Sequence, residues 1–157
     1  MIRQALPTDA PQVRAIWNTM ITASTANFSE IEKTLAEVEA AISAQPVFLV
    51  AEEEDRLLGF ATYGQFRANS GYRFTMENTI ALLPEGKGRG IGRALMAGIE
   101  DHARAGGAHS MIAGISAENA AGLAFHAALG YDRVAVVPQS GFKWGRWLDL
   151  VLMQKIL

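Results

Sequence analysis

The stretch that most constrains the fold is Lys87-Gly88-Arg89-Gly90-Ile91-Gly92-Arg93, with glycine at every second position from 88 to 92. It follows an apolar segment, residues 74–83, and precedes residues 91–105, whose apolar side chains recur at helical spacing. Amides at a helix start lack intrahelical partners and lie at the positive end of the helix dipole. Glycines let such a backbone take positive φ and approach a ligand closely. The stretch therefore predicts a strand, a diphosphate-binding turn and a helix.

Two common phosphate loops fit this stretch poorly. A P-loop ends in Gly-Lys-Ser/Thr, whereas Gly92 is followed by Arg93. A dinucleotide fingerprint needs Gly-x-Gly-x-x-Gly after the first strand, whereas these glycines alternate and lie in the middle of the chain. A turn with a purely structural role stays open as an alternative.

The rest of the chain alternates between strand and helix patterns. Apolar runs predict strands at residues 2–6, 47–52, 57–66, 74–83, 110–115, 131–137 and 147–156. Helical spacing predicts a first helix that Thr8 or Asp9 caps and that ends near residue 24. It predicts further helices over 31–44, from the glycine stretch to about 105, and over 118–129. Turns are expected at 53–56 and 141–146, and a loop at 25–29. This order indicates an α/β fold, a mixed sheet with helices on both faces.

Composition excludes several classes of function. The 157 residues suit a single domain over 1–157, and half of them are hydrophobic. The net charge of −2 disfavours nucleic acid as a partner. The chain has no cysteine, and its three histidines lack metal-ligand spacing, so no metal site is expected. No apolar run approaches the ~20 residues of a membrane span, and we expect a cytoplasmic protein without membrane contact.

Two motifs carry a resemblance to a known family. Lys87 to Gly92 is similar to the acetyl-CoA signature Arg/Gln-x-x-Gly-x-Gly/Ala of the GCN5-related N-acetyltransferase (GNAT) family, with Lys87 where the family usually has Arg or Gln. Downstream, Asn119-Ala-Ala-Gly122 with Phe125-His126-Ala-Ala-Leu129-Gly130-Tyr131 resembles the family's Asn-x-x-Ser/Ala and Leu-Gly-Phe/Tyr helix. The resemblance implies a single N-acetyltransferase domain built on a mixed, mostly antiparallel seven-stranded sheet.

Three segments resemble one branch, the phosphinothricin and methionine sulfoximine/sulfone acetyltransferases. They are residues 63–79, the tail 141–154, and Ile16-Trp17-Asn18 with the loop 25–28. Ala81 and Met76 depart from the branch, which more often has an aromatic residue and Val there. The resemblance implies transfer of an acetyl group from acetyl-CoA, a co-substrate, to the α-amino group of a small amino-acid-like acceptor.

The resemblance also implies which residues bind the cofactor. Backbone amides of β-strand residues would bind the thioester and pantetheine, and the glycine turn would bind the diphosphate. The residue that caps the later helix would bind the cofactor arm. These residues are Ile80, Ala81, Leu82, Lys87, Gly88, Arg89, Gly90, Ile91, Gly92, Arg93 and Asn119. Asn119 could equally be an N-cap with no further role.

Two residues are candidates for the chemistry. An α-amino group is largely protonated at neutral pH, so a base must help, and the resemblance places Glu77 in that role. A surface carboxylate or a carboxylate at a dimer contact is the alternative. His126 lies where relatives often have Tyr, and it would protonate the leaving thiolate. A helix-surface histidine without chemistry is the alternative.

Arg67 and Arg73 are candidates for binding an acceptor carboxylate, because guanidinium groups match its planar geometry. Ordinary exposed arginines are the alternative. Aromatic residues are expected to line the acceptor pocket or to belong to the core; they are Phe28, Phe66, Tyr72 and Trp144. Trp144 and Trp147 could also belong to a homodimer interface, which the resemblance implies.

Two other functions remain open at this point. A peptide or protein N-acetyltransferase would use the same cofactor site, although paired arginines favour a small carboxylate. A non-catalytic acyl-CoA-binding sensor would have no need of Glu77, His126 and the two arginines.

Overall fold

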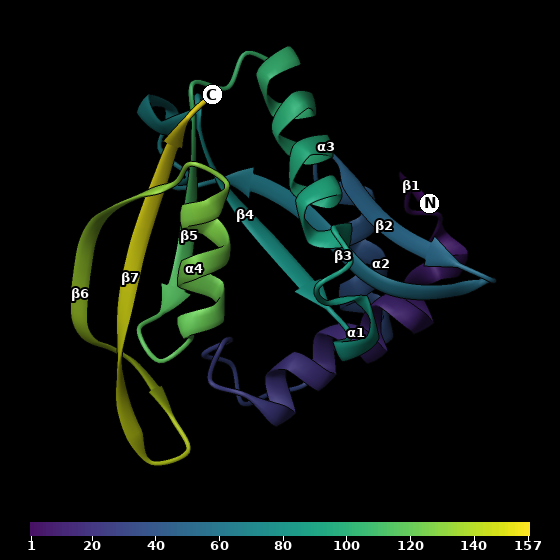
Figure 1. The fold of residues 1–157 in the computed structure, drawn as a ribbon, viewed down its shortest axis with the longest axis horizontal. Coiled ribbons are helices and arrows are strands. Elements are labelled where there is room, and N and C mark those ends of the chain that lie inside the picture. Colours follow the sequence, from purple (N-terminus) through teal and green to yellow (C-terminus); the bar gives the residue numbers. More distant parts are fainter.

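Seven strands form one sheet in the order β1-β2-β3-β4-β5-β7-β6 in the computed structural model, which describes residues 1–157 (Figure 1). Neighbouring strands are antiparallel except β4 and β5, which are parallel. The predicted mixed, mostly antiparallel sheet is therefore confirmed. The strands are β1 (Ile2–Gln4), β2 (Phe48–Glu53), β3 (Arg56–Gln65), β4 (Thr75–Leu82), β5 (Ser110–Ser116), β6 (Asp132–Lys143) and β7 (Arg146–Ile156).

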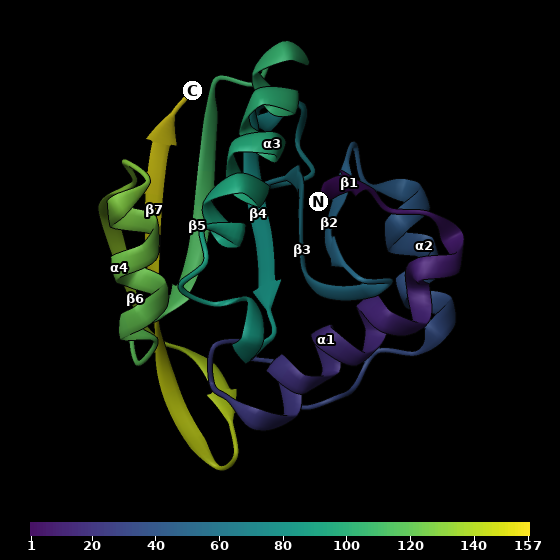
Figure 2. The same cartoon turned by 45° about the vertical axis from the view of Figure 1, so that its right-hand side comes forward.

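Four α-helices cover the two faces of the sheet (Figures 1 and 2). Helices α3 (Ile91–Ala105) and α4 (Ala120–Ala128) lie on one face, and α1 (Ala10–Ala23) and α2 (Leu35–Ala44) lie on the other. Each face has its own hydrophobic core. Leu95, Met96 and Ile99 bring α3 onto the first core, whereas Val13 and Val38 bring α1 and α2 onto the second. The predicted helices on both faces are confirmed.

Helix α1 begins after Asp9, one of the two predicted cap positions, whereas α2 begins later than the sequence analysis predicted. The Thr34 hydroxyl accepts from the Glu37 amide and the Glu37 carboxylate accepts from the Thr34 amide, so α2 begins after residue 34 rather than at 31. Residues 7–9 form a short 3₁₀ turn ahead of α1. The Asp9 side chain does not cap α1, because it accepts from Arg3 and from the Leu6 amide instead.

The C-terminal hairpin differs most from its prediction. Strand β6 was expected to end at residue 137 and a turn to occupy 141–146. Instead β6 continues through an irregularity between Val137 and Gly141 and ends at Lys143. The turn is only Trp144 and Gly145, both at positive φ, which is the backbone of a two-residue hairpin turn. The hairpin therefore extends as a long, twisted pair of strands beyond the body of the sheet (Figure 1).

No helix is long and apolar enough to cross a membrane.

Candidate active site

The glycine turn has the backbone that its sequence predicts. Gly88 and Gly90 have φ of 72° and 79°, in the left-handed region, and Gly90 is the N-cap of α3. A Cβ at either position would meet open space, so it is the backbone conformation that calls for glycine there. Gly92 is different: a Cβ would come within 3.1 Å of both Leu82 on β4 and Phe125 on α4. Its absence lets the start of α3 pack closely between that strand and that helix.

The amides of this turn are available to a ligand. Ala94 is the first to donate within the helix, to the Gly90 carbonyl, so the amides of Ile91, Gly92 and Arg93 have no partner there. The amides of residues 88–90 donate no backbone hydrogen bond either. They lie at the positive end of the α3 dipole. This arrangement can bind a diphosphate.

Three cationic side chains belong to this turn, and two of them form no ion pair within the protein. Lys87 and Arg93 are exposed and make no ion pair. The Arg89 guanidinium binds Glu53 with distances of 2.6 and 3.1 Å. Arg89 can thus offer a phosphate its amide, and Lys87 and Arg93 their charge.

Strands β4 and β5 separate beside this turn. They pair only at Thr75–Ser110, Met76–Met111 and Glu77–Ile112, although β4 stays paired with β3 to Leu82 and β5 with β7 to Ser116. Figure 1 shows the two strands diverging beyond that point. We call the unpaired backbone of residues 78–82 and 113–116 the β4–β5 opening. It is an opening in an otherwise continuous hydrogen-bond ladder, and its polar groups need partners from elsewhere.

Only alternate β4 amides face this opening. The Leu83 amide donates to Leu58 and the Thr75 carbonyl accepts from Phe66, both towards β3. The same alternation directs Ala81 towards its partner Phe60, and Ile80 and Leu82 away from β3. Ile80 and Leu82 are therefore placed as the cofactor prediction requires. The amide of Ala81 is not brought to the opening, because antiparallel pairing turns every second residue to the other neighbour.

Glu77 is the last β4 residue paired with β5, at the edge of the opening. Its carboxylate retains contact with solvent, yet the surrounding protein raises its pKa above the ordinary 4.5 by desolvation, and the charge of Arg67 opposes this effect. Since successive side chains on a strand point to opposite faces, Glu77 lies on the same face as Ala81, which packs in the core beneath α1. Glu77 therefore faces the side opposite to α3 and α4.

His126 is buried in α4, so the alternative of a surface histidine does not describe it. Its Nδ1 lies 2.9 Å from the Gly122 carbonyl oxygen, and its Nε2 lies 3.4 Å from Oδ1 of Asn78. A carbonyl only accepts, so the Nδ1 carries the proton. Burial lowers the pKa of His126 below 6.5, so the ring is neutral at pH 7 and Nε2 is an acceptor.

Asn78 was not identified from the sequence. It lies on β4 at the start of the opening, and its buried side-chain nitrogen has no hydrogen-bond partner. Turning the amide by 180° would let this nitrogen donate to the Nε2 of His126. Asn78 and His126 thus form a polar pair on the α4 face, opposite Glu77. In the sequence, the only indication that Asn78 belongs to the site is its position directly after Glu77.

Asn119 is the N-cap of α4, where its side-chain oxygen accepts from the Gly122 amide at 2.9 Å. This is the capping role that the sequence analysis gave as an alternative. Its contact with a cofactor stays a prediction.

The predicted acceptor residues fall into two groups. Arg67 lies over the ring of Phe66, which packs edge-on against Tyr72, and the charge of Arg67 reaches Glu77. Arg73 instead lies over Phe74 and donates to the Ser70 carbonyl. The structure therefore brings Arg67, Phe66 and Tyr72 together near Glu77 and points Arg73 elsewhere.

Phe28 and Trp144 lie apart from that group. Phe28 packs on Gly141 of β6, and Trp144 is exposed at the tip of the β6–β7 hairpin.

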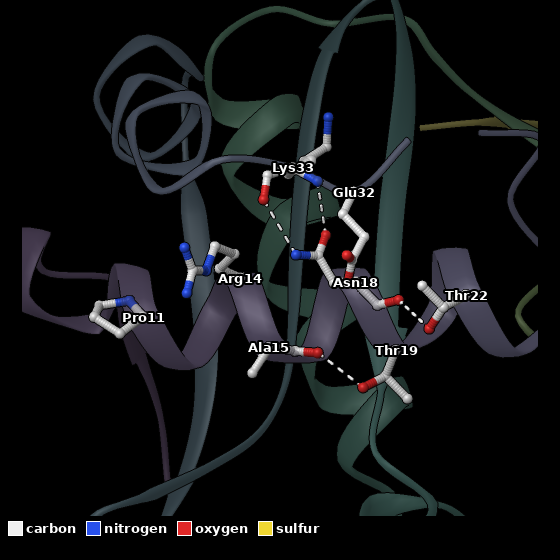
Figure 3. Close-up of a pocket in the computed structure, with 8 residues that line it drawn as sticks. All are labelled: Pro11, Arg14, Ala15, Asn18, Thr19, Thr22, Glu32 and Lys33. Atoms are coloured by element: carbon white, nitrogen blue, oxygen red, sulfur yellow. Dashed lines mark hydrogen bonds between the residues drawn. The ribbon is translucent and has the colours of Figure 1, made fainter. Parts of the chain in front are cut away.

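A surface hollow lies away from these residues. It has a volume of about 440 Å³ and runs along α1 and residues 32–33 (Figure 3). Its lining is polar: Asn18 exchanges two hydrogen bonds with the backbone of Lys33, and Thr19 donates to Ala15. None of the predicted site residues lines it. Nor does any group of three or more His, Cys, Asp or Glu side chains lie close enough to hold a metal ion.

Comparisons with known proteins agree with this geometry. The acetyltransferase (GNAT) family model matches residues 13–131. The chain is 35% identical to the L-methionine sulfoximine/L-methionine sulfone acetyltransferase of Pseudomonas paraeruginosa, over 98% of this chain and 92% of that protein. It is also 35% identical to the phosphinothricin N-acetyltransferase of Alcaligenes faecalis, over 99% of this chain and 82% of that protein.

A solved structure gives the same result. YncA from Salmonella typhimurium, solved with its cofactor acetyl-CoA, superimposes with a TM-score of 0.95 at 35% identity, covering 100% of this chain and 93% of that one. Fold and matches together define an acyltransferase. The chain belongs to the acetyltransferase (GNAT) family and is an N-acetyltransferase of that family.

Proposed function

We propose that this enzyme transfers the acetyl group of acetyl-CoA directly to the α-amino group of a small amino-acid-like acceptor of the methionine sulfoximine, methionine sulfone or phosphinothricin type. The observation that carries the proposal is the β4–β5 opening. On one side of it lies a turn with free amides, and on its other face lies a carboxylate with raised pKa beside an arginine. Donor and acceptor can therefore meet from opposite faces of the sheet.

The residues present fit acetyl-CoA. Amides 88–93, with the charges of Lys87 and Arg93, would hold the diphosphate, and the amides of Ile80 and Leu82 would pair with the pantetheine arm along β4. The turn glycines leave open space where a side chain would otherwise stand. When bound, acetyl-CoA supplies a thioester whose carbonyl carbon accepts an amine. Asn119 would contact the same arm from the N-terminus of α4.

Glu77 would act as the base. It takes a proton from the acceptor's ammonium, directly or through a water molecule, which frees the nitrogen lone pair. The nitrogen then forms a bond to the carbonyl carbon, and the carbon–sulfur bond breaks to leave a thiolate. Desolvation raises the pKa of Glu77 above its ordinary 4.5, which makes the carboxylate a stronger base.

Stabilisation of the carbonyl oxygen would come from the β4 amide that faces the opening nearest the acyl group, because negative charge grows on that oxygen. His126 would supply the proton for the leaving thiolate. The Nδ1 proton is donated to the Gly122 carbonyl, so Nε2 is the ring atom available for this role. Once the acceptor nitrogen has bonded to the carbonyl carbon, it carries one proton more than the amide product; Nε2 would take up that proton and pass it to the sulfur. His126→Asn removes this relay, so kcat should fall, and an unchanged kcat would remove His126 from the role.

Arg67 would recognise the acceptor's carboxylate. It is the arginine that acts on Glu77, so a carboxylate bound to it would bring the adjacent ammonium towards the base. Phe66 and Tyr72 would line the side of this pocket, with Phe28 approaching from the α1–α2 connection. Arg73 would have to leave Phe74 to join Arg67.

A thiol-release assay with acetyl-CoA tests the proposed function. The panel is methionine sulfone, methionine sulfoximine, phosphinothricin, unmodified amino acids and a short peptide. Saturable release with one of the first three is the expected result. Preference for the peptide would favour a peptide N-acetyltransferase. Acetyl-CoA binding with no release above hydrolysis for any acceptor would favour a sensor, and either result overturns the proposal.

We further propose a homodimer through the β6–β7 hairpin. Strand β6 is the last in the sheet, and it presents exposed apolar side chains with those of the hairpin tip. These are Val134, Val136, Val137, Phe142, Trp144 and Trp147. A second copy of the same surface would bury them and cover the free strand edge.

A further inference from the structure

Lys143, at the end of β6, is fully buried although no carboxylate pairs with it. Its Nζ donates to the carbonyl oxygens of Ile21 at 2.6 Å, Ser24 at 2.7 Å and Asn27 at 2.6 Å. An ammonium has three hydrogens, so every one is used. Burial lowers the pKa of Lys143 from its ordinary 10.5, and the charge of Glu30 raises it.

These carbonyls belong to the end of α1 and the residues after it. Ile21 lies in the last turn of α1, and Ser24 is its C-cap. Carbonyls at a helix end lack intrahelical partners and carry the negative end of the dipole. Lys143 therefore caps α1 from a strand more than a hundred residues later in the sequence. The cap extends to Asn27, beyond the helix, so it also determines the path of the connection to α2.

Residues 24–30 have three further ties to the same region. Phe28 packs so closely on Gly141 that a Cβ there would lie 2.5 Å from its ring. The Trp144 amide donates to Glu30 at 2.6 Å. Thr25 donates to Glu118 at 2.9 Å, and Arg146 binds the same carboxylate. The β6–β7 hairpin and the start of α4 thus hold residues 24–30 in one place.

That place is the end of the molecule where β4 and β5 diverge. In Figures 1 and 2 the chain leaving α1 passes below the ends of β5 and α4 and beside the hairpin before it returns to α2. It comes from α1, which covers the face of the sheet that Glu77 also faces. No hydrogen bond joins residues 24–30 to the glycine turn. Thr25 instead contacts Glu118, two residues beyond the end of β5, the strand that bounds the opening. The segment therefore lies next to the open end of β5, on the α1 side, and is separate from the donor side.

We propose that Lys143 is a positioning residue for the acceptor: from β6 it holds residues 24–30 as one wall of the path to the β4–β5 opening. This inference rests on the proposed function. Binding of the acceptor, but not binding of acetyl-CoA, should therefore depend on Lys143. The structural consequence is that residues 24–30 lose their fixed position when the ammonium is removed, while the glycine turn keeps its own.

The test compares Lys143→Met with Lys155→Met. Lys155 lies on β7 and binds Glu100 at 2.6 Å, so its replacement removes a part-buried ammonium from the same hairpin without touching residues 24–30. For Lys143→Met we expect the acceptor KM to rise roughly ten- to hundredfold, because displacement of a positioning element by about 1 Å has effects of that size. The acetyl-CoA Kd, from calorimetry, should stay within about twofold, as for a distant site. Lys155→Met should change neither constant.

Hydrogen exchange followed by mass spectrometry gives a second readout that needs no turnover. Peptides spanning residues 24–30 should exchange faster in Lys143→Met and should be unchanged in Lys155→Met. Peptides spanning the glycine turn, residues 87–93, should exchange at the same rate in both variants. Glu30 is exposed, so Glu30→Ala removes the hydrogen bond to the Trp144 amide without changing a buried group. Residues 24–30 should exchange faster in this variant too.

Three results would overturn the inference. They are an unchanged acceptor KM in Lys143→Met, an equal loss of acetyl-CoA affinity, or unchanged exchange of residues 24–30 in both Lys143→Met and Glu30→Ala. Failure of the proposed function has a different signature, namely absence of turnover in the unmodified enzyme. In that case Lys143 has no role in acceptor binding, and the exchange measurement alone decides whether it holds residues 24–30 in place.

Discussion

At the scale of single residues, two neighbours on β4 serve opposite faces of the sheet. Glu77 faces the α1 side, where the acceptor is expected, and Asn78 contacts His126 on the α4 side. Resemblance to the family predicted Glu77 and His126, whereas Asn78 was missed. A lone asparagine in a strand has no pattern of its own, and only the burial of its amide beside His126 reveals its role.

Replacing Glu77 with Gln should reduce kcat by roughly 10²- to 10⁴-fold, the range for loss of a general base. The pKa of Glu77 is raised above 4.5, and the base works only when deprotonated. The acid limb of kcat/KM should therefore lie above pH 4.5 in the unmodified enzyme and disappear in Glu77→Gln. Initial rates between pH 4.5 and 9 measure this.

Glu54→Gln, in the exposed β2–β3 turn, is the matched control and should retain the full profile. An acid limb that persists unchanged in Glu77→Gln would remove this residue from the role of base.

His126 should make stability depend on pH. Its pKa in the folded protein is lowered below 6.5, so on acidification the unfolded chain takes up the proton first. The free energy of unfolding should therefore fall as pH decreases through 6.5, by at most ~1.4 kcal/mol for each pH unit from this one group. In His126→Asn that contribution should vanish. Urea unfolding at pH 7.5 and 5.5 provides the comparison, and equal pH slopes in the two proteins would contradict the burial of a neutral ring.

At the scale of elements, the glycine turn was predictable and the hairpin was not. Alternating glycines before a helix pattern predict a turn from local sequence alone, and the structure has the predicted strand, turn and helix there. The β6–β7 turn depends on Trp144 adopting positive φ, which its side chain gives no reason to expect. The start of α2 was predictable in principle, since Thr34 and Glu37 have the spacing of a capping box.

Gly90→Ala tests the turn as an element. At φ of 79° an alanine should cost about 1–2 kcal/mol of stability, and by moving the turn it should weaken acetyl-CoA binding. Gly106→Ala is the matched control, because Gly106 follows the same helix at negative φ and a Cβ would meet only ordinary contacts. Thermal unfolding and calorimetric titration measure both effects. Identical behaviour of the two variants would show that the backbone of the turn does not matter.

At the scale of the whole molecule, strand number, strand type and helix placement followed from the sequence, but the separation of β4 from β5 did not. The two strands stop pairing after Glu77 and Ile112, and nothing in either local sequence marks that point. Lys143 illustrates the same limit. Its three acceptors lie 116 to 122 residues away, so no local pattern around this residue indicates that its ammonium is buried.

The proposed homodimer is also a property of the whole molecule. Val136→Lys places a charge in the exposed apolar face of β6 and should produce a monomer, since burial of an unpaired charge opposes association. Leu6→Lys, an exposed apolar residue away from the hairpin, should leave the mass unchanged. Light scattering after size-exclusion chromatography measures the mass. A monomeric unmodified protein, or a dimer that survives Val136→Lys, would contradict this interface.

Calorimetric titration of the folded enzyme with acetyl-CoA tests the central claim most directly, because donor binding by the α3 amides underlies each later step. The account predicts a single saturable binding event per chain that is weakened in Gly90→Ala and preserved in Glu77→Gln. Absence of binding heat in protein that unfolds cooperatively, or equal affinity in Gly90→Ala and the unmodified enzyme, would contradict it.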